Sequence, residues 1–181
     1  VVLGNLLGNG NVNAVKLADG AVGGDELKGR EFGVGAEGER CGCGGGAAKG
    51  ECDMLVLIRG AGDLASGVSL RLHRAGFPVV MTDLPKPTAI RRTVCFSQAI
   101  RFGTTTVEDA EGVCCHTARE VKDTLDAEKI PVLPDETAKC KDWLHPDVLV
   151  DGILAKKNLG TKMSDAPLVI ALGPGFCAGR D

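Results

Sequence analysis

Three small residues at fixed spacing, followed by one acid, form the most informative chemical pattern in this sequence of 181 residues. Gly60, Gly62 and Ala65 make a G-x-G-x-x-A turn. Gly60 permits a tight turn, and Gly62 has no Cβ, so a pyrophosphate could approach the backbone there. Asp83 lies 21 positions after Gly62, about where a ribose hydroxyl pair needs an acid. The pattern is typical of a dinucleotide-binding βαβ unit.

The elements around this turn must position it. An apolar run at 55–58 predicts a buried strand, and a second run at 77–81 predicts the strand that ends at Asp83. Between them, a helical pattern starts inside the turn and ends at Gly76. The free N–H groups and the positive dipole end of that helix would face the phosphates. We therefore expect the first ligand-binding group to comprise Gly60, Gly62, Asp63, Leu64, Ala65 and Asp83.

A basic segment follows the second strand. Two prolines in the sequence after Asp83 force an extended exit, and Thr88 is expected to cap a short helix with Ile90 and Val94 turned inward. Arg91 would then lie close to the ligand end of the sheet, where it could reach a phosphate or an anionic substrate. A solvated arginine on a helix face is the alternative.

Two later strands deliver further groups to the same edge. The run at 147–152 predicts a buried strand ending in an acid, and Lys156 and Asn158 lie just past its carboxyl end. The run at 167–172 predicts the last strand, and Gly173 and Gly175 form a second glycine turn after it. Doubly wound sheets bind ligands at the carboxyl ends of their strands. We therefore add these four residues to the expected cofactor-binding rim.

The remaining segments complete an α/β pattern. Short paired strands are expected at 104–107 and 112–116, a helix capped by Thr117 follows, and a further strand is expected at 130–133 before a helical turn at 139–144. Alternating strands and helices predict a Rossmann-like, mostly parallel sheet with helices on both faces.

Residues 1–53 differ from this pattern. They hold 15 of the 26 glycines and show no sustained periodicity, so we expect a Gly-rich segment that is disordered or a non-native extension. Residues 54–181 are expected to form the Rossmann-like domain. The sequence stops just after a strand and a glycine turn, so we expect that domain to be truncated at its C-terminus.

Composition argues against several classes of function. The net charge is −3 and no basic patch exists, so nucleic acid is not an expected partner. No apolar run reaches the length of a membrane span, so no membrane association is expected. Cys41, Cys43 and Cys52 match no standard zinc spacing, so no metal site is expected. Cys114 and Cys115 are expected to be buried thiols in a reducing cytoplasm.

Residues 54–181 resemble the YqeB family of accessory proteins for selenium-dependent molybdenum hydroxylases. The specific motifs are TAIRR at 88–92, DGILAKKN at 151–158 and ALGPGF at 171–176. That family is similar to the Rossmann half of XdhC-type maturation factors, which serve xanthine dehydrogenases by handling their molybdenum cofactor. The resemblance implies a cytoplasmic accessory role in a bacterium or archaeon. It also implies a molybdenum hydroxylase apoenzyme as partner and an anionic, phosphate-bearing small molecule as ligand.

The ligand and the activity stay open at this stage. NAD(P) and a molybdopterin-type dinucleotide both present phosphates to such a turn, so the cofactor is undecided. The alternatives to a maturation factor are an NAD(P)-dependent oxidoreductase and a Rossmann-type nucleotide-binding sensor. An oxidoreductase needs a proton-transfer residue, and the sequence has no Tyr and identifies no catalytic residue. A non-enzymatic maturation factor is therefore favoured.

Overall fold

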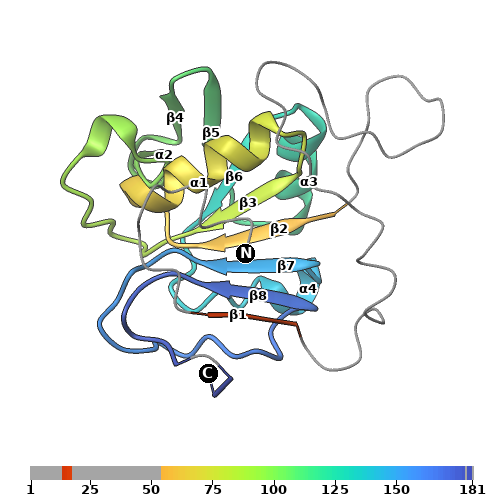
Figure 1. The fold of residues 1–181 in the computed structure, drawn as a ribbon. Coiled ribbons are helices and arrows are strands. Elements are labelled where there is room, and N and C mark those ends of the chain that lie inside the picture. The colour runs from red at the N-terminus through yellow and green to blue at the C-terminus, as the bar shows by residue number, and fades with distance from the viewer. Residues whose placement is uncertain (1–13, 18–53, 178, 181) are drawn as a thin grey trace.

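A computed structural model describes residues 14–17, 54–177 and 179–180. Within them, eight strands form one sheet in the order β1-β8-β7-β2-β3-β6-β5-β4 (Figure 1). The six strands from β8 to β5 are parallel, and β1 and β4 each pair antiparallel at an edge. The strands are β1 (Ala14–Leu17), β2 (Val56–Arg59), β3 (Val79–Thr82), β4 (Thr104–Val107), β5 (Ala110–Cys114), β6 (Ile130–Leu133), β7 (Val148–Asp151) and β8 (Leu168–Ala171).

The helices cover both faces of the sheet, as the sequence predicts. They are α1 (Asp63–Arg74), α2 (Gln98–Phe102), α3 (Ala118–Asp126) and α4 (Lys141–Leu144), with a 3₁₀ turn η3 (Arg92–Val94). Figure 1 shows α1 in front of the strands and α3 and α4 behind them. The expected α/β class, with a Rossmann-like and mostly parallel sheet, is confirmed.

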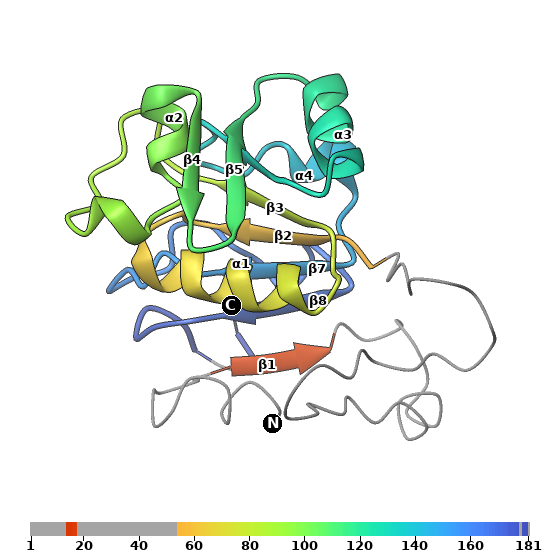
Figure 2. The ribbon, with the colours of Figure 1, turned by 90° about the horizontal axis from the view of Figure 1, so that it is seen from above.

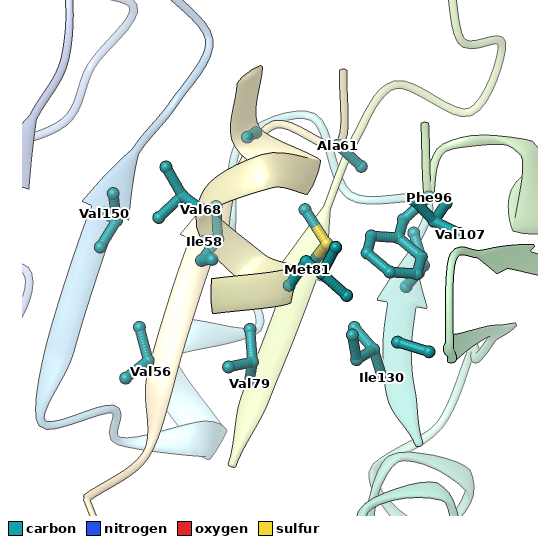
Figure 3. Packing of buried hydrophobic residues seen from close by; sticks show 14 of the residues in the cluster. Val56, Ile58, Ala61, Val68, Val79, Met81, Phe96, Val107, Ile130 and Val150 are labelled. Carbon is teal, nitrogen blue, oxygen red and sulfur yellow. The ribbon is translucent and has the colours of Figure 1, made fainter. Parts of the chain in front are cut away.

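Alternate side chains of the central strands feed two hydrophobic cores, one on each face. Val56 and Ile58 of β2 pack under α1, whereas Leu57 points to the opposite core with Val121 of α3. Figure 3 shows Val68 of α1 between Ile58 of β2 and Val150 of β7. Because both faces are covered, the central strands are continuous apolar runs, which is why they are readable from sequence.

The two edges of the sheet are less regular. The β4–β5 hairpin pairs Thr104 with Val113, as expected. Figure 2 shows its turn beside the helix α1, where Arg74 forms ion pairs with Glu108 and Asp109. At the other edge, β1 pairs with β8 through Ala14 and Ala171. The strand β1 is the described part of residues 1–53. The other residues of this segment, for which disorder was expected and which include Cys41, Cys43 and Cys52, lie outside the described residues. Among the described residues, no helix is both long and apolar enough to cross a lipid bilayer.

The helix α3 begins at a reciprocal cap, as the sequence predicts for Thr117. The Glu120 N–H donates to Thr117 Oγ1 over 3.2 Å, and Glu120 Oε2 accepts from the N–H groups of Thr117 and His116 over 3.3 and 2.7 Å. These hydrogen bonds lower the pKa of Glu120. The cap therefore satisfies N–H groups that the first turn leaves free.

The prediction of a short helix after Thr88 is wrong. The chain is irregular from Pro85 to Arg91, and the first helical segment after it is the single 3₁₀ turn η3. Ile90 is 95% exposed and Val94 is 43% exposed, so neither is turned inward. Phe96, with no exposed surface, fills the core instead. The four-residue spacing of Ile90 and Val94, which suggested a helix, thus does not mark a buried stripe.

Candidate functional site at the carboxyl edge of the sheet

The turn at Gly60 is fixed by contacts to two neighbouring strands. The Gly60 N–H donates to the Thr82 carbonyl over 2.8 Å, and the Gly152 N–H donates to the Arg59 carbonyl over 2.8 Å. Gly60 has φ +99°, and a Cβ there would lie 3.3 Å from the Gly152 carbonyl carbon. The fold itself therefore requires glycine at position 60.

Gly62 is different, because nothing in the described structure requires glycine there. It is the N-cap of α1 with φ −69° and ψ −176°, an extended conformation that any residue adopts. A Cβ at this position would meet no heavy atom within 4 Å. The first turn of α1 thus faces open space at Gly62, and this is where a phosphate would approach helix N–H groups.

Ala65, the third small residue, packs inside the fold. Ala65 is 1% exposed, and a Cβ added to Gly152 would lie only 3.0 Å from the Cβ of Ala65. A larger residue at position 65 would push α1 away from the exit of β7. Leu64 is instead 49% exposed at the rim. Gly60 and Ala65 therefore serve the packing of the fold, whereas Gly62 leaves room for a ligand.

Asp83 lies beside the glycine turn, as expected for the acid at the end of β3. Its Oδ2 accepts from the Ala61 N–H over 3.1 Å, and its Oδ1 accepts from the Leu84 N–H over 2.7 Å. Burial raises the pKa of this carboxyl, and the two N–H donors oppose that shift. A carboxylate has about four acceptor positions, so Asp83 can brace the turn and still accept from a ribose hydroxyl.

Arg91 reaches the helix N-terminus through Asp63. Its Nε donates to Asp63 Oδ2 over 2.7 Å and its Nη2 makes a short contact with the same oxygen, while Asp63 Oδ1 accepts from the Leu64 N–H over 2.9 Å. The Arg91 hydrogen bond is the main cause that lowers the pKa of Asp63. Both side chains are exposed, at 70% and 36%, so this ion pair is weak and opens at little cost.

The loop after β7 and the turn after β8 pack on one another. A Cβ on Gly173 would lie 3.0 Å from Leu154 Cα, and one on Gly175 would lie 2.7 Å from the Ala155 carbonyl oxygen. Close backbone packing thus explains both glycines without a ligand. Lys156 is exposed on the same loop. Asn158 holds the loop, since its Oδ1 accepts from the N–H groups of Gly160 and Thr161 over 2.7 and 2.9 Å.

A buried polar cluster at this edge does not follow from the local sequence pattern. Arg59, the last residue of β2, is 5% exposed, and Asp151, the last residue of β7, is 1% exposed. Arg59 Nη1 lies 3.5 Å from Asp151 Oδ2 and donates to Thr161 Oγ1 over 2.7 Å. The available signal was a charged residue at the end of each of two apolar runs, but their pairing depends on the register between strands.

One buried thiol, that of Cys95, lies beside the site. Cys95 has no exposed surface, and its Sγ donates to the Arg91 carbonyl over 3.0 Å. Burial raises the pKa of Cys95. Cys114 Sγ lies 3.6 Å from His116 Nε2. Across the part of the chain that the structure describes, no three His, Cys, Asp or Glu side chains are grouped to hold a metal ion.

These features define an α/β protein in which a Rossmann-like glycine turn opens at the carboxyl edge of a parallel sheet. The chain is similar to a protein of Escherichia coli (strain K12) named "Uncharacterized protein YqeB", with 50% identity over 128 residues. The match covers 71% of this chain and 24% of that protein, so the chain spans about a quarter of the length of this curated relative. The similarity supports the YqeB family name for the matched part.

Two further comparisons add no relative. No family model matches the chain, and no solved structure matches it. The assignment of the fold therefore rests on the strand order and on the turn geometry described above.

Proposed function

We propose that the chain binds an anionic, phosphate-bearing, nucleotide-like ligand at the turn Gly60–Ala65. The observation that carries this proposal is Gly62, whose backbone any residue could adopt and whose missing Cβ leaves open space before α1. A fold that needed only a tight turn would need only Gly60. Open space at the N-terminus of a 12-residue helix suits a phosphate group.

The residues at this edge fit such a ligand. The helix N–H groups beside Gly62 would hold the phosphates, and Asp83 would accept from a ribose hydroxyl pair. Arg91 balances the charge of Asp63, and it can turn to a phosphate because its present ion pair is weak. Lys156 adds a second exposed cation on the loop after β7. NAD(P) and a molybdopterin-type dinucleotide share the phosphates that this arrangement would recognise, so both stay candidates.

The charged groups at this edge favour binding over turnover. The carboxylates of Asp63, Asp83 and Asp151 all accept hydrogen bonds that hold neighbouring backbone or side chains in place. Taking up a proton would weaken hydrogen bonds that hold the turn or the loop, so these carboxylates suit binding better than proton transfer. We therefore propose a non-enzymatic carrier or maturation role rather than that of an NAD(P)-dependent oxidoreductase.

The partner that we propose is a selenium-dependent molybdenum hydroxylase apoenzyme. This step rests on the motifs TAIRR, DGILAKKN and ALGPGF, through which the chain resembles accessory proteins of those enzymes. The similarity to YqeB agrees with the family but names no activity. The chain would present the cofactor, or a precursor that carries its phosphates, to the apoenzyme.

Genetic complementation tests this role with the complete gene. A host that lacks the gene should still make the hydroxylase polypeptide, but with low activity and an absent or incomplete molybdenum cofactor. The intact gene should restore activity, whereas Gly62→Asn, Arg91→Ala and Lys156→Ala versions should not. Lys122→Ala, which removes an exposed lysine on α3, is the matched control and should restore activity. Normal hydroxylase activity and metal content in the deletion strain would overturn the accessory role.

A further inference from the structure

A buried arginine connects three segments at the carboxyl edge of the sheet. Arg59 Nη2 donates to the Leu159 carbonyl over 2.9 Å and to the Glu136 carbonyl over 3.2 Å. Its Nη1 donates to Thr161 Oγ1 over 2.7 Å. One guanidinium thus holds the loop after β6 and the end of the loop after β7, while its own backbone leads directly into Gly60.

Asp151 fastens the same loop at both of its ends. Its Oδ1 accepts from the Ile153 N–H over 3.1 Å, at the start of the loop. Its Oδ2 accepts from the Thr161 hydroxyl over 2.6 Å, at the end. Thr161 is 3% exposed, so its hydroxyl accepts from Arg59 and donates to Asp151 out of contact with bulk water. The segment 152–161 is therefore closed into a loop that displays Lys156 between two fixed ends.

Stability alone is a poor reason for this cluster. Moving an ion pair from water into the protein interior costs much of the free energy that the attraction of the two charges supplies. Apolar side chains of the same volume often stabilise a fold as well. In addition, Arg59 Nε and Thr82 Oγ1 are buried without a hydrogen-bond partner among the described residues. These two residues are register neighbours on β2 and β3. A polar cluster that leaves such atoms unpaired is better explained by the directions that its hydrogen bonds impose.

We propose that Arg59 is a positioning residue that, through Asp151 and Thr161, fixes the loop 152–161 against the glycine turn. The Arg59 carbonyl accepts from the Gly152 N–H, and a Cβ on Gly60 would lie 3.3 Å from the Gly152 carbonyl carbon. The backbones of the turn and of the loop are therefore in direct contact. In this proposal Arg59, which is 5% exposed, acts through the loop and needs no contact with the ligand. The effect on ligand affinity rests on the proposed function, whereas the effect on the loop does not.

The test removes the hydroxyl of Thr161 and keeps its shape. Thr161→Val removes the hydroxyl that bridges Arg59 and Asp151 and leaves their direct 3.5 Å contact in place, and Thr161→Ser restores a hydroxyl. Thr124→Val is the matched control, because Thr124 is also a buried threonine, on α3, with its hydroxyl 3.3 Å from Cys115 Sγ. Arg59→Lys provides an independent change, since an ammonium keeps the charge but cannot reach three partners in fixed directions.

Two measurements on the full chain read out the loop directly. Trypsin cleavage after Lys156 and Lys157 is followed by mass spectrometry under native conditions, together with amide hydrogen exchange of 153–161. Both rates should rise about tenfold in Thr161→Val and Arg59→Lys, as expected when a hydrogen bond to a charged group is lost. The rates should be normal in Thr161→Ser and Thr124→Val, and exchange in α1 should be normal in all four variants.

Ligand binding is measured on the same proteins by calorimetry with ADP and NAD as probes. Thr161→Val should weaken the binding of whichever probe the wild type binds, and Thr161→Ser should restore it. Unchanged cleavage and exchange in Thr161→Val and Arg59→Lys would overturn the positioning role. A loosened loop with undiminished affinity would overturn its link to the ligand site. A wild type that binds neither probe counts against the proposed function, while the cleavage result still decides the role of Arg59.

Discussion

Replacing the two glycines of the turn separates what the fold needs from what the ligand needs. Gly60→Ala places a Cβ on a residue with φ +99°, 3.3 Å from the Gly152 carbonyl carbon. Gly62→Asn places a side chain on an N-cap residue with φ −69°, where a Cβ meets nothing within 4 Å. The two changes are two positions apart, yet they should have opposite effects on stability and binding.

The geometry sets the size of each effect. A non-glycine residue held at such a positive φ costs about 1–3 kcal/mol. A loss of about 2 kcal/mol would lower the Tm by roughly 5–10 °C in a domain of this size. Asparagine is among the best N-cap residues and differs from glycine there by only a few tenths of a kcal/mol, roughly, so Gly62→Asn should melt at or slightly above the wild type.

The assay combines thermal unfolding with calorimetric titration of ADP and NAD. Gly62→Asn should lose binding of any probe that the wild type binds, because its amide fills the open space and accepts from the helix N–H groups that a phosphate would use. A Tm drop equal to that of Gly60→Ala would show that Gly62 is structural. Undiminished binding by a stably folded Gly62→Asn protein would refute a phosphate site at this turn.

Three further predictions concern charged and titrating groups at or near the edge. Asp83→Ala should weaken nucleotide binding by about 1–3 kcal/mol in calorimetry, because ribose hydroxyls would lose their acceptor; an unchanged affinity would remove Asp83 from the site. Asp63→Asn should tighten binding of an anionic probe by about 0.3–1 kcal/mol, since it removes a negative charge from the N-terminus of α1 and frees Arg91; weaker binding would contradict this. Burial, together with Asp135, raises the pKa of the Cys140 thiol from 9.0 to about 12. Between pH 9 and 12 the folded protein therefore keeps a thiol proton that the unfolded chain loses. The contribution of this protonated thiol to the free energy of unfolding is complete below pH 9 and is lost as the pH rises from 9 to 12, by at most about 1.4 kcal/mol per pH unit. Between pH 8.5 and about pH 10, the free energy of unfolding in urea should fall less in Cys140→Ala than in the wild type. An equal fall in both proteins would contradict a raised pKa of Cys140.

Much of the fold was predictable because its strands are short apolar runs between strong turn residues. The strand, turn and helix from Val56 to Arg74 follow directly from G-x-G-x-x-A and its flanking patterns. The capping box at Thr117 was readable for the same reason, since it depends on residues three positions apart. Local rules suffice where the structure is set by neighbours in sequence.

The rest depends on contacts between distant segments. Ile90 and Val94 have helical spacing, yet both are exposed, and Phe96 is the residue of this segment that enters the core. The pairing of Arg59 with Asp151 depends on the parallel register of β2 and β7, 92 positions apart in sequence. The backbones of Gly173 and Gly175 pack on the loop after β7, and their expected place at the ligand stays a prediction. Neither a register nor a close approach of two loops can be read from a local pattern.

The most direct test of the central claim is the small molecule that co-purifies with the full-length protein. Mass spectrometry and phosphorus analysis of the wild type and of Gly62→Asn, purified in parallel, would identify and quantify it. We expect a phosphate-bearing, nucleotide-like compound in the wild type and none in the variant. A bound compound without phosphate, or equal retention by Gly62→Asn, would contradict a phosphate-binding site at the turn Gly60–Ala65.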